Sequence, residues 1–276
     1  MIAVTGANGQ LGRAVVTECS KRGIAYRAFN RNDLDVTNPK AVNKVFADRS
    51  YDCIVHCAAY TAVDNAEDHP QEAFATNAYA PWLLASTGVP ILSVSTDYVF
   101  DGHATTPYET NAPVCPLSVY GLSKRAGEIV LLEGRFLGAI VRTAWVYSKR
   151  EDTKNFFHTM RRLAQERSEI HVVNDQIGAP TLAEDLAAAL VTLFEKGAHR
   201  KPMHVLHFTN WGACSWFDFA TEIVHMTHPE CAVLPIPSSS YPTKAQRPAY
   251  SVLSLRSLEP YGIEPRHWKE ALSSPL

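Results

Sequence analysis

Short runs of hydrophobic residues alternate, along the first half of the chain, with longer segments in which hydrophobic residues recur at helical spacing. The short runs, which predict strands, lie at residues 2–5, 25–29, 53–57, 91–95 and 139–142. The longer segments, which predict helices, lie at residues 10–22, 39–48, 70–86 and 118–133. Strands and helices that alternate in this way favour an α/β fold with a doubly wound parallel sheet, covered by helices on both faces.

The regularity weakens after Tyr147. Helices are expected at residues 155–166 and 182–195, and a hydrophobic run at residues 170–173 lies between them. Most of the prolines fall in the last part of the chain, where they predict loops. We therefore expect a smaller, loop-rich region that packs at the carboxyl ends of the strands.

Composition and charge narrow the class of protein. The chain has 276 residues, of which 46% are hydrophobic, and it can bury a large core. The net charge is −2 without any basic block, which argues against nucleic-acid binding. No hydrophobic run approaches the roughly 18 residues of a membrane span, and the first residues do not resemble a signal peptide, so a cytoplasmic location is expected. The six cysteines show no disulfide pattern and are expected to be free thiols.

Three glycines with the spacing GxxGxxG follow the first predicted strand directly. Gly6 permits a tight turn, Gly9 lets the backbone approach a pyrophosphate, and Gly12 allows the next helix to pack closely on the strand. The amino terminus of that helix then presents unpaired N–H groups to the phosphates. The motif therefore predicts a Rossmann-type sheet in which residues 1–147 and 177–200 form a dinucleotide-binding domain. Residues 148–176 and 201–276 are expected to form an interleaved substrate-binding region.

The residues after the second predicted strand indicate which nicotinamide cofactor is bound. An acidic residue at this place would bind the ribose hydroxyls of NAD. This chain has Asn30 and Arg31 instead, and arginine presents a planar fork that suits the 2′-phosphate of NADPH. Asp33 and Asp35 lie close by, so NADH stays open as the alternative cofactor.

Tyr120 and Lys124 lie four residues apart and therefore share one face of a predicted helix. A free tyrosine, with a pKa of about 10, is a poor proton-transfer group. A nearby ammonium stabilises the phenolate and lowers that pKa. Tyr120 could then protonate a carbonyl oxygen as hydride arrives at carbon, and Lys124 could also hold the nicotinamide ribose.

Two hydroxyl groups, those of Ser95 and Thr96, end the fourth predicted strand. Ligands of open α/β sheets bind at the carboxyl ends of the strands. Either hydroxyl could donate a hydrogen bond to a substrate carbonyl and polarise it. A turn that merely terminates the strand is the alternative interpretation.

Taken together, these motifs resemble the extended short-chain dehydrogenase/reductase family and, more narrowly, the dTDP-4-dehydrorhamnose reductase family. The narrower resemblance rests on residues 57–64, 142–147 and 174–181 and on Arg247-Pro248, which follow the family's order over essentially the whole chain. It implies NADPH-dependent reduction of a dTDP-linked 4-keto-6-deoxyhexose, dTDP-4-dehydro-L-rhamnose, to dTDP-L-rhamnose, a polysaccharide precursor.

The motifs and the resemblance together assign roles to individual residues. The expected catalytic residues are Thr96, Tyr120 and Lys124. The expected cofactor-binding residues are Gly6, Asn8, Gly9, Gln10, Leu11, Gly12, Asn30, Arg31, Asp35, Val36, Ala58, Ala59, Tyr60, Tyr120 and Lys124. The expected substrate-binding residues are Val63, Tyr98, Trp145, Asn155, Gln176 and Arg247.

The chain departs from the family pattern in two places. Pro81 lies in the helix predicted at residues 70–86, so this helix is expected to be broken or shortened, with altered packing near Asn77. Ala14 stands where some family members carry a glutamate that binds magnesium at a dimer interface. We expect no metal, because His204 and His207 would face opposite sides of a strand and Pro229 separates the later histidines from Cys231.

Two alternative functions stay open. The chain could be a reductase for another dTDP-4-keto-deoxysugar epimer, or a non-catalytic subunit of the same fold that regulates another enzyme. The presence of Thr96, Tyr120 and Lys124 argues against the second, because a pure binding module does not need all three. The expected oligomeric state is a monomer or a weak homodimer.

Overall fold

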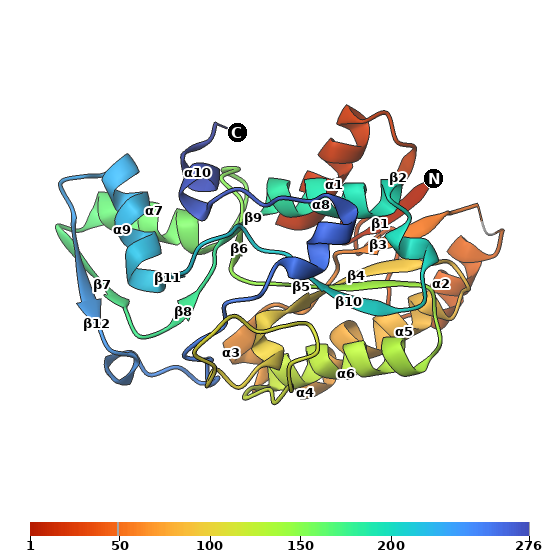
Figure 1. Cartoon of the computed structure of the whole chain (residues 1–276), viewed down its shortest axis with the longest axis horizontal. Helices are drawn as coiled ribbons and strands as arrows, with labels where there is room; N and C mark the ends of the chain where they lie inside the picture. Colours follow the sequence, from red (N-terminus) through yellow and green to blue (C-terminus); the bar gives the residue numbers. More distant parts are fainter. Residues whose placement is uncertain (49, 276) are drawn as a thin grey trace.

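The computed structural model describes residues 1–48 and 50–275, which form a six-stranded parallel sheet with helices on both faces and a smaller region beside it (Figure 1). The strand order is β10-β5-β4-β3-β1-β2, and every pair of neighbours is parallel. The strands are β1 (Ile2–Thr5), β2 (Tyr26–Phe29), β3 (Cys53–His56), β4 (Ile91–Thr96), β5 (Gly138–Thr143) and β10 (His204–His207). The predicted α/β class and doubly wound parallel sheet are thereby confirmed.

Each face of this sheet packs against its own set of helices. Helices α1 (Gln10–Lys21) and α8 (Ala183–Glu195) cover one face, where Val15 and Leu190 are fully buried. Helices α2 (Pro39–Phe46), α5 (Ala80–Ala85) and α6 (Val119–Glu133) cover the other (Figure 1). The central strands are buried on both faces, which explains why they are continuous hydrophobic runs rather than alternating ones.

The strand order reverses between β1 and β3, because the chain leaves β1 toward β2 on one side and later returns to β3 on the other. Side chains from the carboxyl ends of these strands therefore surround a crevice at the reversal. Such a crevice is where open α/β sheets bind their ligands. The glycine-rich turn after β1 lies at this place.

The smaller region has its own hydrophobic core, which includes Phe157, Phe219 and Trp268. Its helices are α7 (Phe156–Glu166), α9 (Trp216–Thr227) and α10 (Trp268–Ser273). Three two-stranded pairs accompany them: β7 (Glu169–Val173) with β12 (Ala232–Ile236), β8 (Ile177–Gly178) with β11 (Cys214–Ser215), and β6 (Val146–Tyr147) with β9 (Thr181–Leu182). Short helices occur at α3 (Val63–Ala66), η2 (Asp97–Val99), η3 (Ala198–Arg200), η4 (Ser238–Ser240) and η5 (Arg256–Tyr261).

The boundary expected at residue 200 does not coincide with the edge of the large sheet. Strand β10 lies within residues 201–276 but pairs with β5 and completes the sheet. Leu258 and Tyr261 of η5 also pack into the core on the α1 and α8 face. These segments were assigned to the substrate-binding region because strand pairing with distant residues leaves no local mark in the sequence.

The helix predicted at residues 70–86 is not broken. It runs through α4 (Pro70–Phe74), the π-helical turn η1 (Ala75–Tyr79) and α5. Pro81 has no N–H to donate, and the chain adopts i→i−5 bonding there, with the N–H of Ala80 donating to the carbonyl of Ala75. The expected break is therefore wrong, and the proline is accommodated by a wider turn.

No helix among residues 1–48 and 50–275 is long and apolar enough to cross a membrane.

Candidate active site

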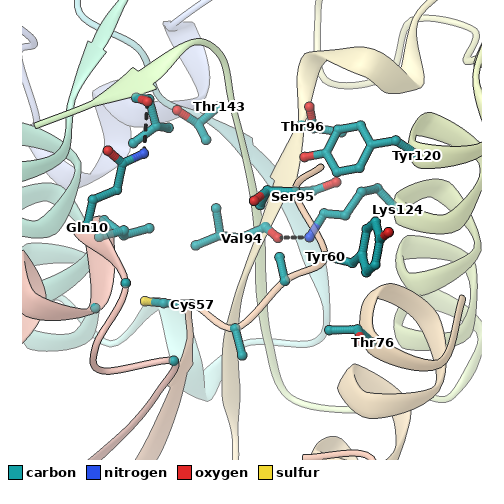
Figure 2. Close-up of a pocket in the computed structure, with 18 of the residues that line it drawn as sticks. Gln10, Cys57, Tyr60, Thr76, Val94, Ser95, Thr96, Tyr120, Lys124 and Thr143 are labelled. Atoms are coloured by element: carbon teal, nitrogen blue, oxygen red, sulfur yellow. Dashed lines mark hydrogen bonds between the residues drawn. The ribbon is translucent and has the colours of Figure 1, made fainter. Parts of the chain in front are cut away.

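A cavity of about 780 Å³ opens at the carboxyl ends of the strands (Figure 2). Residues from the turn after β1, the loop after β2 and the ends of β3, β4 and β5 line it, together with residues of α6 and α9. Of the residues expected from the sequence, the following line this cavity: Gly6, Asn8, Gly9, Gln10, Leu11, Gly12, Asn30, Arg31, Asp35, Val36, Ala58, Ala59, Tyr60, Val63, Thr96, Tyr98, Tyr120, Lys124 and Trp145.

The turn between β1 and α1 is packed so tightly that two of its glycines cannot be replaced. Gly6 has φ +69°, and a Cβ there would lie 2.6 Å from the backbone nitrogen of Ala58. A Cβ on Gly12 would lie 2.2 Å from the carbonyl oxygen of Gly6. Helix α1 begins after Gly9 without a side-chain cap. Its first N–H groups are therefore available to an anion in the cavity, which fits the pyrophosphate of a dinucleotide.

The loop after β2 contributes one cationic side chain, that of Arg31, to the lining of the cavity. The side chain of Asn30 accepts hydrogen bonds from the backbone N–H groups of Asn32 and Asp33, and Asp35 accepts from Thr37. The hydrogen bonds from Thr37 hold the pKa of Asp35 below its usual value. Arg31 is exposed, and no hydrogen bond or ion pair to the other described residues occupies its guanidinium.

The acid–base pair lies on the first two turns of α6. Ser118 caps this helix by accepting from the N–H of Gly121, and the side chains of Tyr120 and Lys124 both line the cavity. The ammonium of Lys124 donates to the carbonyl oxygen of Val94 over 2.6 Å. Figure 2 shows this bond, and it shows Tyr120, Thr96 and Lys124 on one wall with Gln10 on the opposite wall.

Burial shifts the pKa values of both groups. It raises the pKa of Tyr120 to about 12, and a hydrogen bond with Thr96 opposes this shift. It lowers the pKa of Lys124 to about 8, although the carboxylate of Glu128 acts in the opposite direction. At neutral pH Tyr120 is therefore protonated, as a proton donor must be, and Lys124 is mostly charged.

The two hydroxyls at the end of β4 point to different partners. Ser95 donates to the buried carboxylate of Glu128 over 2.7 Å, so its hydroxyl is occupied behind the cavity. The Thr96 hydroxyl lies beside Tyr120 and donates to the carboxylate of Asp97 over 3.1 Å, so it must turn away from Asp97 to donate to a substrate. Burial raises the pKa of Asp97 to about 6. Of the two candidates, Thr96 is the one placed to reach a substrate carbonyl.

Aromatic side chains form the wall nearest the smaller region. Trp145 stacks on Trp216 of α9 with ring centroids 3.6 Å apart and planes at 10°. Trp145 has φ +48°, a conformation that a bulky residue adopts only where its surroundings impose it. A Cβ on Gly178 would lie 2.6 Å from the Trp145 ring, so this glycine makes room for the indole.

Three expected substrate-binding residues do not line the cavity. Asn155 caps α7 and donates to the side chain of Gln10 over 3.1 Å. Gln176 donates to the Ser238 hydroxyl over 2.8 Å. Arg247 forms an ion pair with Asp64 over 2.7 Å. Each of these side chains is engaged with the protein itself.

Other lining residues had no committed role in the sequence analysis. They are Leu34, Thr37, Cys57, Thr61, Glu72, Ala75, Thr76, Val94, Ser95, Asp97, Thr143, Ala144, Val146 and Trp216. Ser95 had been weighed as an alternative to Thr96, and the motifs at residues 57–64 and 142–147 include five others without a role. Cys57, Val94 and Thr143 lie at the ends of predicted strands, so the rule that ligands bind at strand ends could have found them. Trp216 comes from the loop-rich region and had no such signal.

Among residues 1–48 and 50–275, no group of three or more His, Cys, Asp or Glu side chains could hold a metal ion. His204 contacts the hydroxyl of Tyr261, whereas His207 is buried beside Arg142. Ala14 lines a second cavity of about 470 Å³, which shares no lining residue with the first.

Comparisons with known proteins agree with this geometry. The family model described as RmlD substrate binding domain matches residues 1–276. The chain is 39% identical to the spore coat polysaccharide biosynthesis protein SpsK of Bacillus subtilis, over 100% of this chain and 96% of that protein. It is 38% identical to a dTDP-4-dehydrorhamnose reductase of Mycobacterium tuberculosis, over 100% of this chain and 92% of that protein. The crystal structure of dTDP-4-dehydrorhamnose reductase from Bacillus anthracis in complex with NADP is similar with a TM-score of 0.90 and 36% identity, over 98% of this chain and 96% of that chain.

Proposed function

The chain belongs to the RmlD substrate binding domain family, and from this premise we infer that it reduces dTDP-4-dehydro-L-rhamnose to dTDP-L-rhamnose with NADPH. The observation that carries this function is that an uncapped helix terminus and the Thr96–Tyr120–Lys124 group face each other in the cavity of about 780 Å³. One side fits a dinucleotide, and the other fits a carbonyl group that accepts a proton. The regulatory-subunit alternative does not explain why the complete acid–base group is present.

We propose the following roles for the chain's own residues. The turn at Gly6, Gly9 and Gly12 holds the cofactor's pyrophosphate, and NADPH when bound supplies the hydride for C4 of the sugar. Tyr120 donates its proton to the 4-keto oxygen, while Thr96 donates a hydrogen bond to the same oxygen. Lys124 stabilises the phenolate that Tyr120 leaves behind.

The aromatic wall at Trp145 and Trp216 supports a place for the sugar, with Val63 and Tyr98 beside it. The residues around β1, β2 and α1 then form the cofactor half of the protein, and the smaller region supplies the substrate half. A monomer or a weak homodimer suffices for this site, because all the residues named come from one chain. Measuring the mass in solution over a range of protein concentrations tests the oligomeric state.

The direct test of function is incubation of the protein with dTDP-4-dehydro-L-rhamnose and NADPH. The expected result is one NADPH oxidised for each sugar reduced, with dTDP-L-rhamnose identified by NMR. A different C4 epimer would favour the alternative reductase. NADPH binding without any turnover of 4-keto nucleotide sugars would favour the regulatory subunit.

Cofactor preference is proposed to depend on Arg31, the exposed cation at the adenosine end of the cavity. Arg31→Ala should raise KM for NADPH with little change in kcat, because the contact is equally present in the ground and transition states. KM for NADH should change little. Lys40→Ala, which removes an exposed charge outside the cavity lining, is the matched control. Equal efficiency of the unmodified protein with both cofactors would contradict the proposal.

A further inference from the structure

A third polar residue lies on the same face of α6 as the acid–base pair. Tyr120, Lys124 and Glu128 follow one another at intervals of four residues, so their side chains lie one above the other. Glu128 does not line the cavity, and it is only 2% exposed. A carboxylate buried so deeply is rare unless it has a specific set of partners.

The carboxylate of Glu128 joins α6 to two strands. It accepts hydrogen bonds from Nε and Nη2 of Arg142 on β5, both over 2.8 Å, and from the Ser95 hydroxyl on β4 over 2.7 Å. Ser95 and Arg142 are themselves partners in the register of β4 and β5. Arg125, one turn back on α6, donates over 3.0 Å. Although burial acts to raise it, the pKa of Glu128 is held below its usual value by Arg142, so the carboxylate is charged.

Arg142 extends these contacts to other elements. Its Nη1 donates to the carbonyl oxygen of Thr110 over 3.1 Å and contacts Nε2 of His207 on β10 over 3.4 Å. Its guanidinium lies 5.1 Å from the centre of the Phe100 ring. The ends of β4, β5 and β10 and the loop beyond β4 are thus tied, through one ion pair, to the helix that carries Tyr120 and Lys124.

Glu128 also acts on Lys124 through its charge. The other titratable groups that influence or adjoin Lys124 are Tyr120 on its own helix and His56 and Cys57 at the end of β3. The guanidinium groups of Arg125 and Arg142 pair with Glu128 and oppose its charge in part. Buried neutral His56 and Cys57 contribute no charge near neutral pH. Glu128 is therefore the carboxylate that favours the ammonium form of Lys124 in its buried position.

We propose that Glu128 is a positioning residue: it holds the helix of Tyr120 and Lys124 against the ends of β4 and β5, and its charge keeps Lys124 protonated. This inference rests on the proposed function, in which the ammonium of Lys124 stabilises the Tyr120 phenolate. It adds a residue that touches neither cofactor nor substrate and acts through Lys124.

The test compares Glu128→Gln with Ser95→Ala, which removes a hydrogen bond to the same carboxylate but no charge. Two measurements are made as a function of pH: single-turnover oxidation of NADPH by the 4-keto nucleotide sugar, and the Kd for NADPH. Because Lys124 must be charged, the rate should fall and the Kd for NADPH should rise as pH increases through the pKa of Lys124. In Glu128→Gln this loss of rate and affinity should begin at lower pH than in the unmodified protein. In Ser95→Ala it should begin at the same pH as in the unmodified protein. The rate at low pH should fall in Glu128→Gln, by about 10²-fold if the helix moves by 1 Å.

A decline at the unmodified pH in Glu128→Gln overturns the proposal, whatever the loss of rate, because a purely structural residue would slow the reaction without moving its pH dependence. If this variant does not fold, the double variant Glu128→Gln/Arg142→Gln, which leaves no unpaired buried charge, is compared with Arg142→Gln, so that the two proteins differ only at residue 128. The decline should then begin at lower pH in the double variant, and an equal pH overturns the proposal. Unmodified protein that binds NADPH but reduces no sugar contradicts the proposed function alone. The pH dependence of NADPH binding still decides the role of Glu128 in that case.

Discussion

At the scale of single residues, the site depends on side chains whose burial changes their acid–base behaviour. Burial raises the pKa of Tyr120 to about 12, so its hydroxyl is protonated at neutral pH. Lys124 has its pKa lowered to about 8 and contacts the carbonyl of Val94. At neutral pH both groups therefore have the protonation state that the proposed roles require, a protonated donor and a cation that stabilises the phenolate.

Tyr120→Phe removes one hydroxyl and leaves the aromatic ring in place. Folding and NADPH binding should survive, while single-turnover hydride transfer should slow by roughly 10²–10⁴-fold. Lys124→Met should slow the same step and also weaken NADPH binding, because lysine acts on both. The measurements are NADPH absorbance in single turnover and a cofactor titration. Near-normal turnover of Tyr120→Phe would mean that the proton comes from another group. Asp97 and Tyr98 would then be the next candidates for the proton donor.

Two buried histidines should make the protein sensitive to acid. Burial lowers the pKa of His56 and of His207 to about 3, from 6.5. Below pH 6.5 the unfolded chain binds protons that the folded protein does not, so stability is lost as pH falls from 6.5 toward 3. The slope is about 1.4 kcal/mol per pH unit for each histidine, well below 6.5. Urea unfolding at several pH values in this window measures it.

The controls for this prediction come from the chain itself. His56→Gln and His207→Gln should each reduce the slope of the unfolding free energy against pH by about 1.4 kcal/mol per pH unit, even where they lower the stability at every pH. Leu122→Ala, which removes an exposed side chain without an ionisable group, should leave the slope nearly unchanged. If the unfolding free energy depends on pH with the same slope in all three variants, the buried histidines do not cause the acid sensitivity.

At the scale of elements, the position of α6 is set by its close approach to the π-helical turn η1. Pro81 has no N–H, so the carbonyl of Asn77 has no donor at the usual α-helical place and lies against Gly127 of α6. The side chain of Asn77 bonds to both backbone groups of Tyr60 and to the hydroxyl of Ser123. The irregular turn thus connects the end of β3 to the catalytic helix.

Gly127→Ala should separate these two elements. A Cβ at this position would lie 2.1 Å from the carbonyl oxygen of Asn77, and both atoms belong to rigid backbone. We expect a loss of about 1–3 kcal/mol in the free energy of unfolding, and slower hydride transfer because α6 carries Tyr120 and Lys124. Leu122→Ala, on the exposed face of the same helix, should change stability by about 0.5 kcal/mol at most. Chemical denaturation and single-turnover kinetics test both variants, and equal stability of the two would contradict the role given to Gly127.

At the scale of the whole molecule, the cavity lies where the large sheet meets the smaller region. Trp145 follows β5, Trp216 belongs to α9, and their stacked rings join the two parts at the cavity wall. Cofactor binding should therefore depend on the sheet side, and sugar binding on the position of this aromatic pair.

Gly178→Ala tests whether sugar binding depends on the aromatic pair while cofactor binding does not. The added methyl group would lie 2.6 Å from the Trp145 ring and should displace it. KM for the sugar nucleotide should rise by about tenfold, equivalent to about 1.4 kcal/mol, while the Kd for NADPH should stay within about twofold. Steady-state kinetics and a fluorescence titration measure the two quantities, and near-ultraviolet circular dichroism reports on the stacked indoles. A parallel loss of NADPH affinity would show that the two halves of the cavity are not independent.

Much of this protein is determined by local sequence. The strands β1 to β5 and the four long helical segments between them follow from hydrophobic spacing, which needs no knowledge of distant residues, and their observed ends lie within about two residues of those predicted, whereas the short helix α3 was not predicted. The glycine turn and the Tyr120–Lys124 pair are also local, because a fixed spacing on one strand–turn–helix or one helix is enough to place their side chains.

Other features were decided only by the tertiary structure, because they depend on contacts between residues far apart in the chain. Arg247 is paired with Asp64 across 183 positions, so a cation expected at a diphosphate already has a partner. Ser95 and Thr96 are neighbours with equivalent hydroxyls, and Glu128 of α6 decides between them by engaging Ser95. Trp216 enters the cavity wall from the loop-rich region through its packing against Trp145. Local patterns fix which face of an element is buried, but only the packing of several elements determines which groups meet there.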